Sequence, residues 1–137
     1  MEINLGKTVG LFSVVFGALS GPALLFFPEK VLPCPILLEE GYKLIMVLTM
    51  RRWAQGEMVK WAALVGLLFA MSETVLFWGG TFGQEWTRLL AKGVLALAVH
   101  GGTSVLYAQV FSRGWFAVGL GLGLGWAFHR LANLCGF

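Results

Sequence analysis

The sequence has few charged residues, only two cysteines and no polar linker. Only 12% of its 137 residues are charged and the mean hydropathy is +0.78, which argues against an ordinary soluble domain. The net charge of +3 is small and its basic residues are spread over the expected loops, so nucleic acid is a poor candidate for a partner. No low-complexity segment or charge block divides the chain, which indicates a single domain.

The two cysteines, Cys34 and Cys135, do not have the spacing of a cysteine-based metal site. The topology expected below places both near the non-cytoplasmic surface of a membrane, where a disulfide could persist. Two unpaired thiols in apolar surroundings are the alternative.

Long apolar segments are what the chain does contain, since 58% of its residues are hydrophobic. Uncharged runs from Thr8 to Pro28 and from Gly93 to Ser112 each approach the roughly 20 residues that a helix needs to cross the hydrocarbon layer. Other segments are long enough if a few ionisable residues are tolerated inside them. We therefore expect an all-α fold, an integral membrane bundle of about five transmembrane helices, at residues 8–28, 33–50, 61–79, 89–111 and 115–133.

The tryptophans and the basic residues agree with these limits. Tryptophan prefers the headgroup level of a bilayer, and Trp53, Trp61, Trp78, Trp86 and Trp115 all lie at expected helix ends. Five Lys and Arg residues fall on the N-terminal side of the membrane against four on the other side, which slightly favours a cytoplasmic N-terminus.

Alternating glycines between Gly119 and Gly125 do not indicate a nucleotide-binding loop, because no strand is expected before them and the spacing differs. On a helix they form two pairs four residues apart, Gly119 with Gly123 and Gly121 with Gly125. Such pairs allow a neighbouring helix to approach closely, so we expect them to serve packing.

Ionisable side chains occur inside four of the expected helices. A charged residue near the centre of a membrane helix raises the free energy of insertion by about 2.5 to 3.5 kcal/mol, so several such residues together indicate a structural or functional role. With a rise of about 1.5 Å per residue and alternating helix directions, these residues all fall in the non-cytoplasmic half of the membrane. They are Glu39, Glu40 and Lys43 in the second helix, Glu73 in the third, His100 in the fourth and His129 in the fifth.

The spacings within each helix place further polar groups beside them. Lys43 follows the two glutamates by three and four residues, Thr103 follows His100 by three, and Asn133 follows His129 by four, so each histidine has a neighbour that could orient it. Adjacent carboxylates in a low dielectric cannot easily both ionise, so we expect one to be protonated and Lys43 to stabilise the charge of the other. The alternatives are a snorkelling ion pair near the interface and, at His100, a simple interhelical hydrogen bond.

The order of these residues along the chain resembles the PrsW family of glutamic-type intramembrane proteases, which are related to the CAAX prenyl endopeptidases. The resemblance rests on Glu39-Glu40-x-x-Lys43, Phe69-x-x-x-Glu73, His100 and His129-x-x-x-Asn133, one motif per helix. It implies that the paired glutamates, Glu73 and the two histidines form a catalytic centre in which a glutamate activates water to attack a peptide bond. It also implies a membrane-anchored protein as substrate and a prokaryotic cell membrane as location. CAAX-type enzymes differ in the basic-residue spacing and carry a histidine at the position of Glu73, so prenylated substrates are less favoured.

Two questions stay open at the level of sequence. His100 and His129 could stabilise an oxyanion or, together with Glu40, could bind zinc, because imidazole and carboxylate are both suitable ligands. The chain could also be a small proton or metal-ion transporter, since Glu and His mark ion pathways, or a catalytically inactive scaffold. A transporter predicts polar groups across the full thickness of the membrane.

Overall fold

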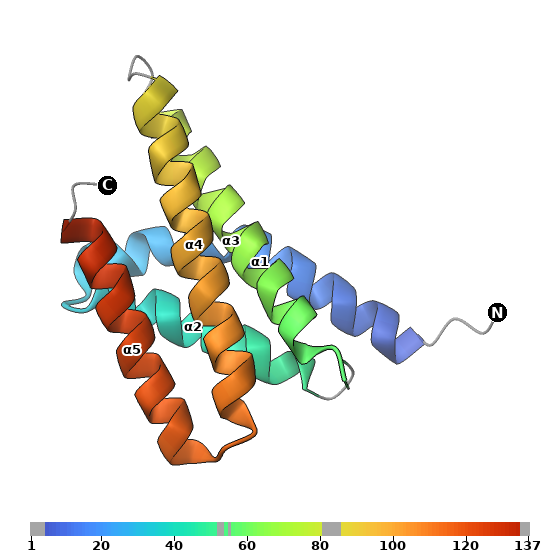
Figure 1. Ribbon diagram of the computed structural model, residues 1–137. Helices are drawn as coiled ribbons and strands as arrows, with labels where there is room; N and C mark the ends of the chain where they lie inside the picture. The colour runs from blue at the N-terminus through green and yellow to red at the C-terminus, as the bar shows by residue number, and fades with distance from the viewer. Residues whose placement is uncertain (1–4, 52–53, 55, 81–85, 135–137) are drawn as a thin grey trace.

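The computed structural model describes residues 5–51, 54, 56–80 and 86–134. Over these residues the chain forms five α-helices and no strand, which confirms the all-α prediction (Figure 1). Each limit of the five predicted segments lies within three residues of the corresponding helix end. The helices are α1 (Leu5–Val31), α2 (Pro35–Met50), α3 (Met58–Gly80), α4 (Trp86–Phe111) and α5 (Trp115–Leu134).

Three of the described helices are long and apolar enough to cross a membrane. The qualifying segments are Thr8–Phe26 of α1, Met58–Trp78 of α3 and Trp86–Phe111 of α4. Helix α2 has 16 residues and a length of about 24 Å, which is less than the roughly 30 Å of a hydrocarbon core. Length and composition therefore support a membrane location through α1, α3 and α4, with α2 and α5 packed between or beside them.

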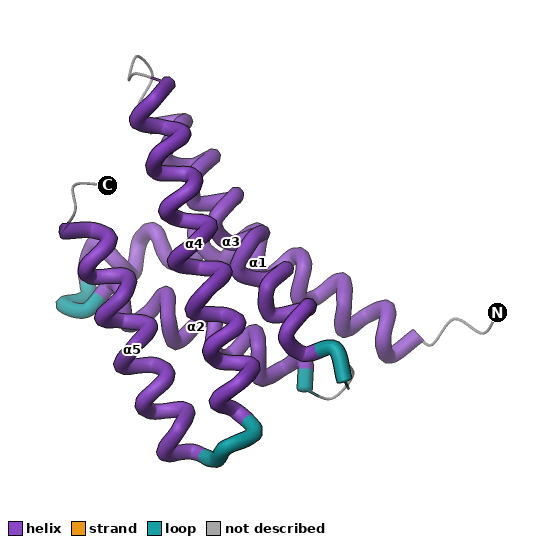
Figure 2. Tube along the Cα trace, viewed as in Figure 1, coloured by secondary structure: helices purple, strands orange, loops and turns teal. Residues whose placement is uncertain are grey.

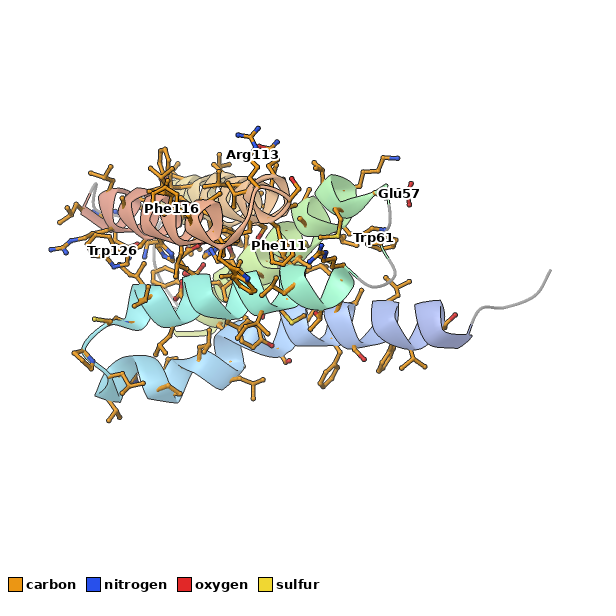
Figure 3. All side chains as sticks on the ribbon, turned by 90° about the horizontal axis from the view of Figure 1, so that it is seen from below. Glu57, Trp61, Phe111, Arg113, Phe116 and Trp126 are labelled. Carbon is orange, nitrogen blue, oxygen red and sulfur yellow. The ribbon has the colours of Figure 1, made fainter. Side chains whose placement is uncertain are left out.

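The five helices form two groups. In Figure 1, α3, α4 and α5 run roughly along one another, while α1 and α2 pass behind them at an oblique angle. The tube in Figure 2 shows the same crossing, and the turned view in Figure 3 shows α1 and α2 side by side beneath α4 and α5. The polar segment of α2 thus lies between α1 on one side and the helices α4 and α5 on the other.

Glycine allows a close approach between α3 and α4. Gly66 of α3 lies against the backbone of α4, since a Cβ there would be 2.6 Å from the Cα atom of Gly101. Helix α1 is held in turn by polar contacts to its backbone: the Tyr42 hydroxyl donates to the Gly17 carbonyl at 2.9 Å and the Ser72 hydroxyl donates to the Leu19 carbonyl at 2.5 Å. Small residues thus let α3 and α4 approach closely enough to fix the side chains between them.

The connections at the ends of α2 and α4 follow from local sequence. Pro35 occupies the first turn of α2, where a missing amide proton costs nothing. Gly114 has a φ of 95° and allows the tight turn from α4 into α5. Cys34 precedes α2 and is exposed. Cys135, its proposed disulfide partner, lies outside the described residues.

Candidate functional site

The centre of the bundle contains a buried ion pair from one face of α2. Glu40 and Lys43 are three residues apart, and the side chains of both are fully buried, with Lys43 Nζ at 2.6 Å from Glu40 Oε1. The ammonium also lies 2.9 Å from Nδ1 of His100 and 2.9 Å from the hydroxyl of Thr103, both on α4. Its three N–H donors therefore have three acceptors, which a charged lysine needs when it is removed from water.

Glu40 receives hydrogen bonds from three of the surrounding side chains. Oε1 accepts from Lys43 and lies 3.0 Å from Nδ1 of His129, on α5, while Oε2 accepts from the hydroxyl of Tyr107, on α4. Room for this arrangement depends on Gly125, where a Cβ would lie 2.9 Å from Glu40 Oε2 and 3.1 Å from Cζ of Tyr107. Three donors around one carboxylate stabilise its charged form inside the protein.

The tautomer of His100 follows from its two neighbours. Lys43 can only donate, so Nδ1 of His100 accepts, and the ring proton is assigned to Nε2. Nε2 lies 2.5 Å from Oε2 of Glu73, on α3, and donates to it. Glu73 has a side chain that is 40% exposed, so this pair connects the buried network to the outside.

His129 lies between the two adjacent glutamates of α2. Its Nδ1 is 3.0 Å from Glu40 Oε1 and 3.3 Å from Glu39 Oε2, so Nδ1 carries a proton that Glu40 accepts, with the second carboxylate close by. Nε2 is then the nitrogen left to act on another group. The rings of His100 and His129 meet edge to face, with their centroids 5.1 Å apart.

A small cavity of about 80 Å³ opens beside these groups. Glu73, His100 and His129 line it together with Asn133 and with Lys92, whose ammonium lies 3.4 Å above the ring of Phe77. A volume of that size holds a few water molecules. The cavity thus places water next to an exposed carboxylate and two imidazoles.

The charges around the cavity do not balance by themselves. Three carboxylates, those of Glu39, Glu40 and Glu73, face the buried ammonium of Lys43 and the ammonium of Lys92 at the cavity edge. In a low dielectric, an uncompensated charge is strongly unfavourable, so an additional proton on an imidazole or a carboxylate is needed. A site with one proton shared among several acceptors suits acid and base chemistry.

In the structure it is Glu39, and not Glu40, that lies with the two histidines in a group of residues that could bind a metal ion. Each of Glu39, His100 and His129 offers a ligand atom, and these atoms lie within 4.8 Å of one another. The residue types are those of a zinc site with an open position. However, both ring nitrogens of His100 are already in hydrogen bonds with Lys43 and Glu73, so metal binding would require one of these bonds to break. The hydrogen bonds of His100 therefore do not fit a bound metal ion.

Most of the site residues expected from the sequence lie close together in the structure. Two residues that were expected to orient the histidines, Thr103 and Asn133, make other contacts. Thr103 accepts a hydrogen bond from Lys43 and its hydroxyl lies 3.4 Å from the backbone carbonyl of His100, whereas Lys43 and Glu73 orient the ring of His100. Asn133 lines the cavity, and the described residues give it no hydrogen bond to His129.

The motifs in the sequence do not include Tyr107 or Ser104. Both are fully buried on α4, and they continue a polar stripe that begins at His100 and Thr103 with spacings of three, four and seven residues. This polar stripe along one face of the helix is the sequence feature that indicates Tyr107 and Ser104 as part of the site. Among the described residues, Ser104 Oγ has no hydrogen-bond partner.

Comparison with family models, with curated protein sequences and with solved structures gives no match for this chain. The resemblance to PrsW proteases accordingly rests on the residues of the site alone.

Proposed function

We propose that this chain is an intramembrane endopeptidase of the PrsW type, which hydrolyses a peptide bond of a membrane-anchored protein. The observation that supports this most is the convergence of Glu73, His100 and His129 from three helices on one small cavity. Glu39 lies beside the same two histidines. Water, a base, a proton donor and groups able to stabilise an oxyanion are the requirements for amide hydrolysis, and residues of each kind occur here.

Glu39 is the better general base of the adjacent pair. Both oxygens of Glu40 already accept hydrogen bonds, and its side chain is fully buried. Glu39 is 13% exposed and lies near both histidines, so a water molecule between these three side chains could give its proton to Glu39. Glu40 then acts by holding His129 and Lys43 in place.

The remaining groups account for the other proton transfers. Nε2 of His129, which carries no proton, accepts a hydrogen bond from the attacking water; the hydroxide oxygen bonds to the carbonyl carbon, and the side-chain amide of Asn133 donates to the oxyanion from the side of α5. The C–N bond breaks as the leaving amine takes a proton from the His100 and Glu73 pair, in which Glu73 carries the additional proton that the charges of the site require and His100 keeps its own Nε2 proton. The proton on Glu39 restores that pair through the cavity water.

We further propose a prokaryotic cell membrane as the location, a cytoplasmic N-terminus and a site in the non-cytoplasmic half. The exposed Cys34 offers a test in cells that carry Cys135→Ser. A membrane-impermeant thiol reagent applied from outside should label Cys34, and labelling only after lysis would reverse the orientation.

The test of activity compares the three glutamates of the site with Glu57, which pairs with Lys60 at the same spacing of three residues as Glu40 with Lys43. Purified protein in liposomes is given a single-span substrate, and cleavage by Glu39→Gln, Glu40→Gln and Glu73→Gln is compared with cleavage by Glu57→Gln. Glu57 pairs with Lys60 on the surface at 3.2 Å and lies at the edge of the bundle in Figure 3. We expect a loss of at least 100-fold for the three site variants and none for Glu57→Gln. Cleavage by all four at the parental rate would exclude the catalytic proposal.

A proton relay is the second candidate, because Tyr107, Glu40, Lys43, His100 and Glu73 form a continuous hydrogen-bonded chain. Tyr107 and His100 are seven residues apart on α4, so the chain covers about 10 Å along the helix, only a third of a hydrocarbon core. Proton flux into liposomes that is lost in His100→Ala would favour the relay. Binding of substrate without cleavage would instead indicate an inactive scaffold.

A further inference from the structure

A second cavity, much larger than the first, runs along the outer side of α4 and α5. Its volume is about 650 Å³, and we call it the α4–α5 groove. Figure 1 shows these two helices side by side, and Figure 3 shows that Phe116 of α5 points away from α2 on the outer side of the bundle. The lining includes Leu95, Gly102, Thr103 and Gln109 of α4 and Phe128 of α5.

The groove adjoins the polar cavity. Leu95, Val99 and Ala132 line both of them, so an occupant of the groove lies next to the cavity that Glu73, His100 and His129 surround. Thr103 in the lining of the groove is also the residue whose hydroxyl accepts a hydrogen bond from Lys43.

The two volumes indicate how a substrate would be held. Ligand sites typically have volumes of about 300 to 1,000 Å³, and the polar cavity, at about 80 Å³, can hold little more than a peptide group and water. The groove, at about 650 Å³, lies within the typical range. Binding energy for a substrate therefore has to come from the groove, while the cavity supplies the reacting groups.

The lining defines the chemistry of the occupant. It contains no charged side chain, and Thr103 and Gln109 are its polar side chains. From Leu95 to Gln109 the groove follows about 21 Å of α4, within a helix that is long and apolar enough to cross a membrane. An uncharged apolar segment of a membrane-spanning helix has the length and polarity to fill it.

We infer that the α4–α5 groove receives the transmembrane segment of the protein substrate and guides its end into the polar cavity. This inference rests on the proposed function. Shape complementarity comes from Gly102, which leaves the centre of the groove open because a Cβ there would meet nothing within 4 Å. Gln109 can hydrogen-bond to backbone groups where the substrate helix unwinds for cleavage, whereas the hydroxyl of the buried Thr103 is already bonded to Lys43.

The first experiment fills the groove without disturbing the packing of the bundle. Gly102→Leu places a side chain in open space within the groove, and Gly119→Leu is the matched control, because its Cβ also meets nothing within 4 Å and it does not line the groove. We expect Gly102→Leu to lower kcat/KM for a single-span substrate by at least tenfold and Gly119→Leu to leave it unchanged. Equal cleavage by both variants would overturn the inference.

The second experiment detects docking without cleavage. In a Glu73→Gln background that also carries Cys34→Ser and Cys135→Ser, a photo-crosslinker is attached to Val105→Cys in the groove or to Leu120→Cys, which is exposed on α5 outside it. Crosslinks to the substrate from position 105 and few from position 120 would support the inference. Equal crosslinking from both, or crosslinks from position 105 only to lipid or to a second copy of the chain, would overturn it. Substrate crosslinks with no cleavage by the parent protein would reject the protease activity while keeping the docking surface.

Discussion

The close approach of Gly66 to the backbone of α4 allows a sharp test of how rigidly the site is held. In Gly66→Ala the new Cβ would lie 2.6 Å from Gly101 Cα and 2.7 Å from the carbonyl carbon of His100. The carbonyl oxygen of His100 lies nearer still and ordinary contact begins near 3.4 Å, so α3 and α4 have to separate by at least about 0.8 Å. Both neighbours are backbone atoms, which cannot turn aside as a side chain can.

That separation acts directly on the site, because Glu73 is on α3 and His100 is on α4. Their hydrogen bond of 2.5 Å would lengthen beyond ordinary range if the helices moved apart by the full amount. A displacement of about 1 Å can reduce an enzymatic rate about 100-fold, so we expect Gly66→Ala to lose between about 10- and 100-fold in cleavage. Overpacking typically lowers the free energy of unfolding by about 1 to 3 kcal/mol, while replacing glycine by alanine inside a helix raises it by up to about 1 kcal/mol.

Gly101→Ala is the control, because it is a neighbour of His100 on the same helix and its Cβ would meet nothing within 4 Å. We expect it to keep parental activity and to be at least as stable as the parent. Thermal unfolding in detergent and cleavage in liposomes measure the two quantities. If Gly66→Ala and Gly101→Ala behave alike in both assays, the contact between α3 and α4 does not control the site, and the argument above is wrong.

Three further predictions concern the buried network. Tyr107→Phe removes one donor from the charged Glu40 and should lower the free energy of unfolding by about 1.5 to 3 kcal/mol, as measured by denaturant titration in mixed micelles; an unchanged stability would show that this bond is not made. Lys43→Met leaves the buried carboxylate of Glu40 without its ammonium and should lower the free energy of unfolding by about 3 to 5 kcal/mol. The double variant with Glu40→Gln should recover much of this loss. Simple additivity of the two changes would contradict the pairing. Because metal binding would disrupt the hydrogen bonds of His100, dialysis against a strong chelator should leave cleavage unaffected, whereas activity that disappears and returns with zinc would establish a metal site.

The helices were predictable because hydropathy and helix limits are local properties. The uncharged run in the first segment and the proline before the second identify helices α1 and α2 with limits within three residues of those observed. The approximate meeting of Glu40, Glu73, His100 and His129 also followed, because ionisable groups in apolar helices avoid lipid by facing one another.

The details of the site depended on helix rotation, which the sequence does not specify. Whether Lys43 pairs with the glutamate three or four residues earlier is decided by which face of α2 meets α4, and the structure places Glu40 there. No motif in the local sequence distinguishes Tyr107 from other aromatic residues, because its hydroxyl bonds to a carboxylate 67 residues away in sequence. Of the two predicted glycine pairs, Gly121 and Gly125 pack inward while Gly119 and Gly123 are exposed, a choice made by the tertiary contacts of α5.

The sequence distances within the polar network have a consequence for how the protein is assembled in a membrane. Glu73 and His100 are 27 residues apart on consecutive helices, so a hairpin of α3 and α4 can satisfy this pair without the rest of the chain. Glu40 depends on partners 67 and 89 residues further on, which are synthesised long after α2 leaves the ribosome. A short helix that carries a carboxylate and an ammonium gains little from lipid until Tyr107 and His129 exist, so α2 should settle last, and chains that end before α5 should expose it to quality control.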